Sequence, residues 1–188
     1  MLFDKSTTAL VIIDLQKGIV QIDTQPYPSS AVVANAARMA KAFRKHRMPV
    51  ILVRVTPSPD GKDALQPIAD RVTPTTNRPP DWADIVPELG PEPGDLLITK
   101  RQWGAFYGTE LDMQLRRRKI ETLVLCGIST NAGVESTARF AYEFGYQQIF
   151  VEDACSARSK EEHEYPMKWT FGRLGRVRKT EDILNELG

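Results

Sequence analysis

Residues 123–153, LVLCGISTNAGVESTARFAYEFGYQQIFVED, constrain the fold of this chain more than any other segment. Their pattern predicts a strand over 123–126, a tight turn over 127–130, a helix that begins near Asn131, and a second strand over 148–152. Two strands that are joined through a helix form a βαβ unit, in which the strands are parallel. The segment therefore predicts part of a parallel sheet that is covered by helices.

The same alternation continues through the rest of the chain. Further strands are expected over 9–13, 50–55, 96–98 and 176–179. Further helices are expected after Ser30, around 110–118 and over 181–187, with Ser30 and Thr180 as capping residues. The fold class that follows is α/β, as a three-layer αβα Rossmann-like fold with a mainly parallel six-stranded sheet.

Length and charge limit the classes of function. A chain of 188 residues is expected to form a single domain, 1–188. Because 25 Lys and Arg residues face 24 Asp and Glu residues, we expect neither nucleic acid nor a membrane surface as a partner. The chain has no run of about 18 apolar residues, and its N-terminal segment is too short and too acidic for a signal peptide. Its two cysteines make no disulfide framework. These features are typical of a cytoplasmic protein.

The segment 56–95 interrupts the rhythm of strands and helices. It holds nine of the thirteen prolines and few periodic apolar positions. A connection of this length inside a compact domain often carries a function. We expect it to serve as a lid or pocket wall, as a subunit contact, or as a plain surface loop.

Two charged residues stand at the ends of predicted strands. Asp14 ends the apolar run of the first strand, and Lys100 ends the third. In an open α/β sheet, ligands bind at the carboxyl ends of the strands, where the strand order reverses. Both residues are therefore candidates for catalysis. The alternatives are a turn or cap aspartate and a solvated strand end.

Three motifs give the chain a family resemblance. They are Asp14 and Gln16 in VIIDLQ; Lys100, Ala105, Phe106, Gly108, Thr109 and Leu111 in KRQWGAFYGTEL; and Gly127, Thr130, Gly133, Val134 and Thr137 in GISTNAGVEST. In this order they resemble the isochorismatase-like hydrolases, also called the cysteine hydrolase superfamily. The resemblance is strongest to the YecD-type branch of that family. Two positions depart from the usual pattern: Gly104 stands where serine is usual, and Gly133 stands where the family has its nucleophilic cysteine.

The resemblance implies a set of catalytic residues, with Asp14 as acid or base, Lys100 beside it, and Gly133 at the nucleophile position. Most members hydrolyse amides through a thioester at the cysteine, a route that needs a nucleophile. The true isochorismatases also have glycine there and hydrolyse a vinyl ether without a covalent intermediate. The missing side chain would then let a ligand approach the helix N-terminus, whereas the alternative is drift at a dead site. The family also has a non-proline cis peptide, whose counterpart here is Ile128–Ser129, aiming the Ser129 amide into the site.

The residues expected to bind the substrate surround these positions: Gln16, Trp103, Phe106, Tyr107 and Ser129. Of the three aromatic residues, at least one is expected to pack in the core instead. Lys100 would pair with the carboxylate of a small anionic substrate, and Arg54 and Arg101 are further candidates for the same contact. The resemblance also implies a homo-oligomer, a dimer or a tetramer.

The remaining cysteines and histidines suggest no metal or other cofactor. Cys126 is expected to be a buried apolar residue, and Cys155 to follow the fifth strand. His46 and His163 are interpreted as helix-surface or capping residues, because two distant histidines make no metal cluster.

Three functional hypotheses remain open. The first is a hydrolase that acts on a small anionic metabolite by Asp14 acid catalysis, without a covalent cysteine adduct. The second is a non-catalytic ligand-binding or regulatory protein, and the third an amidase that uses Cys155. Acid catalysis requires a raised pKa of Asp14, which burial favours and the Lys100 cation opposes.

Overall fold

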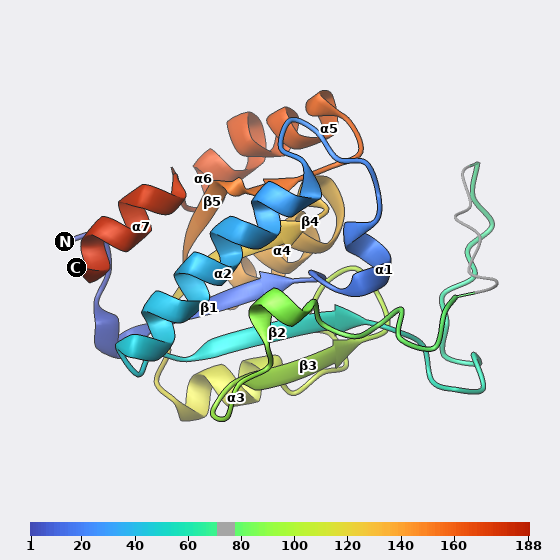
Figure 1. Ribbon diagram of the computed structural model, residues 1–188, viewed down its shortest axis with the longest axis horizontal. Helices are drawn as coiled ribbons and strands as arrows, with labels where there is room; N and C mark the ends of the chain where they lie inside the picture. Colours follow the sequence, from blue (N-terminus) through green and yellow to red (C-terminus); the bar gives the residue numbers. More distant parts are fainter. Residues whose placement is uncertain (71–77) are drawn as a thin grey trace.

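Six parallel strands form one sheet in this computed structural model, which describes residues 1–70 and 78–188 (Figure 1). The strands are β1 (Thr8–Ile13), β2 (Val50–Val55), β3 (Leu96–Lys100), β4 (Thr122–Ile128), β5 (Gln147–Ser156) and β6 (Arg176–Arg178). Helices flank the sheet. The predicted α/β fold with six strands is therefore confirmed.

The order of the strands places the site. It runs β3-β2-β1-β4-β5-β6, so the chain builds outward from β1 to one edge and then returns to the other side of β1 at β4. The order reverses between β1 and β4, and the carboxyl ends of these two strands form the crevice where α/β proteins bind ligands. Asp14 directly follows β1 at this point.

Helices cover both faces of the sheet. They are α1 (Lys17–Val20), α2 (Ser29–Lys45), α3 (Leu111–Arg117), α4 (Glu135–Glu143), α5 (Lys160–Tyr165), α6 (Gly172–Leu174) and α7 (Thr180–Leu187). The helices α2 and α7 contact each other on one face, and α4 and α6 do so on the other (Figure 1). None of the helices in the described ranges is both long and apolar enough to cross a membrane.

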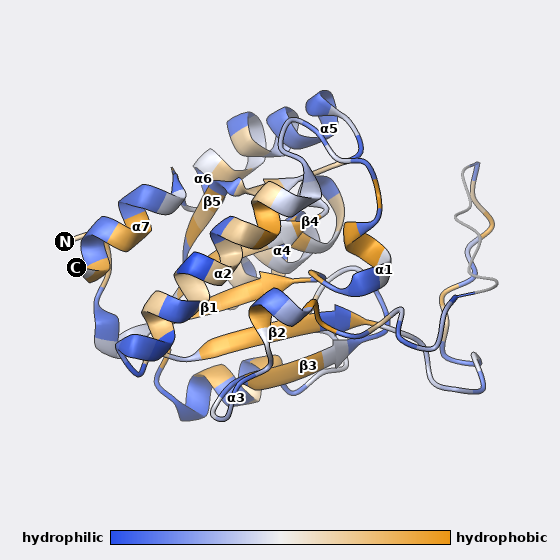
Figure 2. Cartoon of the chain, viewed as in Figure 1, coloured by the Kyte–Doolittle hydropathy of each residue, from blue (hydrophilic) through white to orange (hydrophobic). Residues whose placement is uncertain are grey.

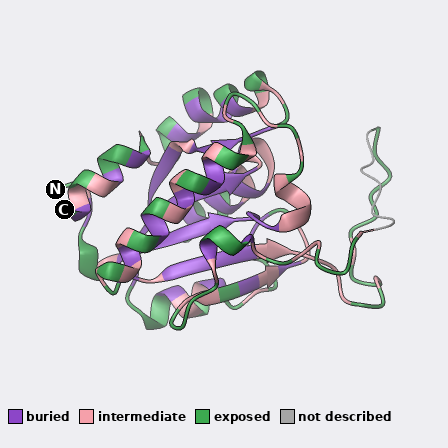
Figure 3. Ribbon diagram, viewed as in Figure 1, coloured by how far each residue is buried: buried purple, intermediate pink, exposed green. Residues whose placement is uncertain are grey.

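The core lies along the central strands. Every residue of β1 and β4 is buried (Figure 3). The edge strand β6, in contrast, is only partly covered. The strands are also among the most hydrophobic elements (Figure 2). A strand with helices on both faces needs apolar residues on both sides, which is why β1 and β4 are continuous apolar runs in the sequence.

Several element boundaries differ from the predictions. β5 extends to Ser156, so Cys155 does not follow the strand but lies inside it, where it pairs with Gly127 of β4. The helix α2 begins at Ser29 after Pro28, and Ser30 is not its cap. Thr180 is the first residue of α7, and its backbone N–H and hydroxyl both donate to Asp153 Oδ1 at 2.8 Å.

Parts of the segment 56–95 are anchored near the carboxyl edge of the sheet; its residues 71–77 lie outside the described residues. Asp63 accepts a hydrogen bond from Arg101 Nε at 2.7 Å. The indole of Trp82 lies over Gly18, where an added β-carbon would be 1.9 Å from Trp82 Cδ1. A short 3₁₀ helix over Pro87–Leu89 completes the described part. The expected role as lid, pocket wall or subunit contact stays a prediction.

Candidate active site

Asp14 and Lys100 meet at the point where the strand order reverses. Lys100 Nζ donates to Asp14 Oδ2 at 2.7 Å and to the carbonyl oxygen of Gln102 at 3.1 Å. The two residues are only 5% and 1% exposed. Asp14 has a φ of 54°, a left-handed conformation that is uncommon outside glycine, Asn and Asp.

Burial has the larger effect on the acidity of Asp14. It raises the pKa of this carboxyl group to about 6 from the ordinary value of 3.8, and the nearby Lys100 cation only partly offsets the increase. The second carboxylate oxygen, Oδ1, is buried and has no hydrogen-bond partner among the described residues. The carboxyl group therefore holds a proton much more readily near neutral pH than a solvated aspartate does.

Gly133 packs against the same pair. A β-carbon on Gly133 would lie 2.9 Å from Asp14 Oδ2, 2.9 Å from Ile13 Cγ2 and 3.6 Å from Lys100 Nζ. The expectation that the missing side chain leaves room for a ligand is therefore wrong in this direction. The carboxylate of Asp14 and a methyl group of Ile13 already occupy the space.

The turn that carries Gly133 begins at an unusual peptide. The bond Ile128–Ser129 is cis, as the resemblance implied. The carbonyl oxygen of Ser129 then accepts the N–H groups of Ala132 and Val134, both at 3.2 Å. These bonds close a wide π-type turn, η3 (Thr130–Val134), that leads into α4. Ser129 itself is partly exposed beside the site.

Gln16 has a structural role in place of the expected substrate contact. Its side chain is fully buried, and its Nε2 donates to the carbonyl oxygens of Val55 at 3.1 Å and Trp82 at 3.4 Å. Its Oε1 accepts the N–H of Val55 at 2.8 Å. Both donors are thus used to join the end of β2 to the segment around Trp82.

The three aromatic residues after Lys100 differ in their environments. Phe106 is buried and packs against Phe144 and Tyr146, with ring centroids 5.3 and 5.8 Å away. It is the one that belongs to the core, and its expected role in the pocket wall is corrected. Trp103 and Tyr107 are 66% and 72% exposed, so within one chain they form no closed wall.

His163 is buried, in place of the helix-surface or capping position that was expected. It is 1% exposed, and its Nδ1 lies 2.9 Å from the hydroxyl oxygen of Thr130. Thr130 is 33 positions away in the sequence. In the sequence, His163 stands in a short helix, and this position is equally compatible with burial and with the surface.

The two cysteines are poor nucleophiles. Both are fully buried and free. Burial raises the pKa of Cys155 to about 12 and raises the pKa of Cys126 well above its ordinary value. Because the thiolate is the reactive form, neither side chain is suited to covalent catalysis.

The other candidate cations are engaged with protein groups. Arg54 Nε donates to Thr99 Oγ1 at 3.1 Å, and Arg101 is paired with Asp63. Within residues 1–70 and 78–188, no group of three or more His, Cys, Asp and Glu side chains could hold a metal ion.

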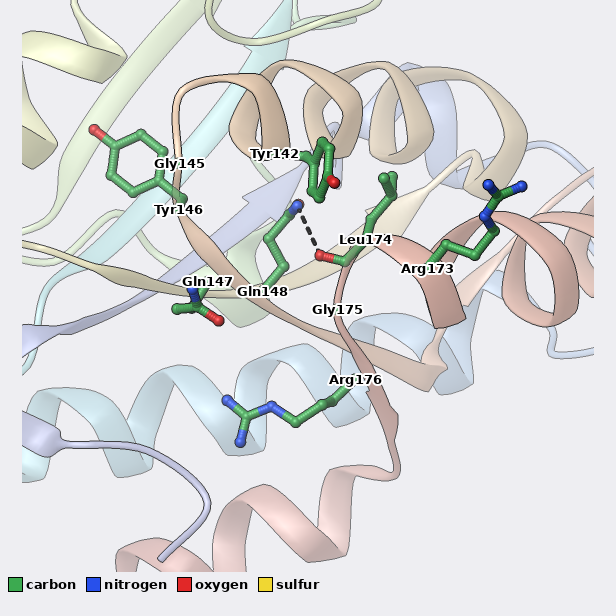
Figure 4. Close-up of a pocket in the computed structure, with 9 residues that line it drawn as sticks. All are labelled: Tyr142, Gly145, Tyr146, Gln147, Gln148, Arg173, Leu174, Gly175 and Arg176. Carbon is green, nitrogen blue, oxygen red and sulfur yellow. Dashed lines mark hydrogen bonds between the residues drawn. The ribbon is translucent and has the colours of Figure 1, made fainter.

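A cavity of about 390 Å³ lies far from this site, at the amino end of β5 (Figure 4). The guanidinium groups of its Arg173 and Arg176 point in different directions (Figure 4). The side-chain oxygen of Gln148, Oε1, is buried and has no hydrogen-bond partner among the described residues. The polar groups therefore do not converge on one ligand.

An α/β sheet with a buried Asp–Lys pair at its switch point is the architecture that the sequence motifs anticipated. A model of the isochorismatase domain matches residues 8–182, and the chain belongs to the isochorismatase family. It is 53% identical over 186 residues to YwoC of Bacillus subtilis (strain 168), an uncharacterised member, with 98% of this chain and 96% of YwoC covered. It is 50% identical over 181 residues to YecD of Escherichia coli O157:H7, with 96% of both proteins covered. The solved structure of an isochorismatase family protein from Burkholderia thailandensis superposes with a TM-score of 0.94 at 45% identity, covering 98% of this chain and 97% of the other.

Proposed function

We propose that the protein hydrolyses the enol ether bond of a small anionic metabolite by acid catalysis, without a covalent enzyme intermediate. Asp14 donates a proton to the terminal alkene carbon, which leaves a cation stabilised by the ether oxygen. Water adds to this cation and returns a proton to the Asp14 carboxylate. The resulting hemiketal breaks down into a ketone and an alcohol, so that one water is consumed overall.

The observation that carries the proposal is the state of Asp14. A general acid works best when its pKa lies near the working pH. The pKa of about 6 meets this condition, whereas the ordinary value of 3.8 would leave the carboxyl group almost fully ionised. The unpartnered Oδ1 is the atom that can carry the proton, because Oδ2 accepts the bond from Lys100.

Lys100 supports an anionic substrate. Its ammonium group has three N–H donors, and Asp14 and Gln102 accept two of them. The third donor can pair with a substrate carboxylate. A carboxylate conjugated to the enol ether would be held there while its neighbouring carbon is protonated.

Gly133 favours this route over amide hydrolysis. In the resembling family the amidases carry a cysteine at this position, and here neither remaining thiol is accessible. Two more distant relatives carry enzyme names. Enterobactin synthase component B of Escherichia coli (strain K12) is 27% identical, and RutB of Methylorubrum extorquens, named as a ureidoacrylate amidohydrolase, is 33% identical. An amidase activity that is unchanged in a Cys155→Ala variant would count against the use of Cys155.

The direct test is turnover of isochorismate and other enol ether carboxylates by the purified protein. We expect Asp14→Asn to lower kcat by about 10²–10⁴-fold, because the amide cannot donate the proton. Asp23→Asn is the matched control, since Asp23 is an exposed carboxylate outside the site. Turnover that survives Asp14→Asn would overturn the mechanism.

A ligand-binding protein without catalysis is the rival outcome. The deep burial of Asp14 and Lys100 fits a binding role as well. A thermal-shift screen of anionic metabolites separates the two functions. Strong stabilisation by a compound that is never consumed would favour the rival.

The exposed aromatic residues fit the expected homo-oligomer. Trp103 and Tyr107 follow Lys100 within a few residues, and a second copy of the chain would cover them. Sedimentation of the protein should then give a dimer or a tetramer, and a Trp103→Ser, Tyr107→Ser double variant should shift it toward the monomer. A wild-type protein that sediments as a monomer at high concentration would exclude this arrangement.

A further inference from the structure

His163 is a buried titratable side chain that the proposed chemistry does not use. It lies on α5, and its Nδ1 is 2.9 Å from Thr130 Oγ1. Its other ring nitrogen, Nε2, is buried without a hydrogen-bond partner in the described part of the chain. Burial lowers the pKa of His163 below its ordinary value of 6.5, which favours the neutral imidazole.

Thr130 connects this histidine to the site. It is the first residue of η3 and stands three positions before Gly133. At the other end of the turn, Thr137 Oγ1 donates to the Gly133 carbonyl oxygen at 2.7 Å and accepts the N–H of Ala105 at 3.1 Å. Two buried threonine hydroxyls therefore anchor the turn, one to α5 and one to the segment that follows Lys100.

The count of unpaired groups selects the tautomer. If Nδ1 carried the proton and donated it, the buried Thr130 hydroxyl hydrogen and the Nε2 lone pair would both lack partners. If Nδ1 accepts the Thr130 hydroxyl hydrogen, only the Nε2–H group stays unpaired. Each unpaired buried group destabilises the folded state, so the second arrangement, which has fewer of them, is favoured.

We propose that His163 is a positioning residue for the turn that carries Gly133. Its Nδ1 accepts the Thr130 hydroxyl and thereby holds η3 against Asp14 and Lys100. A shift of this turn would change the packing around the Asp14 carboxylate, since a β-carbon on Gly133 would already lie 2.9 Å from Oδ2. The effect on turnover rests on the proposed function, whereas the effect on Asp14 does not.

Two substitutions at His163 that resemble each other in shape isolate the hydrogen bond to Thr130. Asn at 163 keeps an acceptor near the place of Nδ1, and Leu has a similar shape without one. We expect His163→Leu to lower kcat about 10–100-fold with little change in KM, as for a small misplacement of catalytic groups. His163→Asn should restore most of the lost activity. Thr130→Val should resemble His163→Leu, and the double variant should be no worse than either single variant.

A readout that needs no turnover is the titration of the Asp14 carboxyl group by ¹³C NMR. We expect His163→Leu and Thr130→Val to move its pKa away from about 6, and His163→Asn to leave it in place. Nitrogen-15 spectra should show the Nε2–H tautomer for His163, with His46 as the only other histidine signal. Equal effects of Leu and Asn, additive effects in the double variant, or an Nδ1–H tautomer would each overturn the proposal. An absence of turnover together with the expected NMR changes would overturn only the proposed function.

Discussion

The side chains of Asp14 and Lys100 form an ion pair of 2.7 Å that is almost completely shielded from solvent. Desolvation of two charges is costly, and a buried pair is by itself weak evidence for stability. Strongly perturbed carboxyl groups cluster at functional sites, and this one lies where the strand order reverses. The position of the pair and the raised pKa of Asp14 support the proposed catalytic role.

Removal of the lysine cation should raise the pKa of Asp14 further. Lys100 opposes the effect of burial, so Lys100→Met leaves burial unopposed and should move the pKa above about 6. The change can be followed by ¹³C NMR of the Asp14 carboxyl group. Lys17→Met is the control, because Lys17 pairs with Asp81 and Asp84 on the surface. An unchanged or lowered pKa in Lys100→Met would show that the ion pair does not act on Asp14 as described.

The activity should fall as the pH rises above about 6. Asp14 must be protonated to act as the acid, and above its pKa the protonated fraction decreases about tenfold per pH unit. The same raised pKa makes the free energy of unfolding depend on pH. The contribution of Asp14 to stability is fully present below the pKa of 3.8 in the unfolded chain, and it is lost as the pH rises through the pKa of about 6 in the folded protein. The profile of kcat/KM between pH 5 and 8 measures the first effect. A profile that is flat over this range would rule out Asp14 as the acid.

The sheet could be predicted because its physical cause is local. Each buried strand needs apolar residues on both faces, and such runs are visible in the sequence at β1 and β4. The end of β5 was missed, since the strand turns polar at Glu152 and Asp153, where a register shift interrupts its pairing with β4 before the pairing resumes at Cys155. Asp153 is polar there because it accepts two bonds from Thr180.

The site could be predicted only in part. Asp14 and Lys100 became candidates through their positions at strand ends and the family motifs, and the structure brings their side chains together. The environments of Gln16 and His163 depend on partners 39 and 33 positions away, and no periodic pattern encodes such contacts. The balance of burial against the Lys100 charge at Asp14 likewise required the packing of the folded chain.

A side chain at position 133 should disturb the pair. The β-carbon of Gly133→Ala would lie 2.9 Å from both Asp14 Oδ2 and Ile13 Cγ2, so the carboxylate must move. We expect a loss of about 10–100-fold in kcat and about 1–3 kcal/mol of stability. Gly133→Cys should not create an amidase, because its β-carbon would have the same close contacts with Asp14 and Ile13.

Gly172→Ala is the matched control for this substitution. Gly172 lies in α6, and an added β-carbon would meet no atom within 4 Å. Its helical position predicts a gain of about 0.5–1 kcal/mol from alanine. If Gly133→Ala retained full activity and an unchanged Asp14 titration, the packing around Gly133 would not be limiting.

Gln16 should prove to be important for stability and not for substrate affinity. Gln16→Ala would leave the N–H and carbonyl groups of Val55 and the carbonyl of Trp82 without their partner. A fully buried unpaired group costs about 1–3 kcal/mol, and these three groups are partly buried, so a loss of about 1–3 kcal/mol in total is expected in urea unfolding. Gln21→Ala, at an exposed position just after α1, should change the free energy of unfolding by less than about 0.5 kcal/mol. A higher KM for Gln16→Ala at an unchanged free energy of unfolding would instead support the expectation, taken from the sequence motif, that Gln16 contacts the substrate.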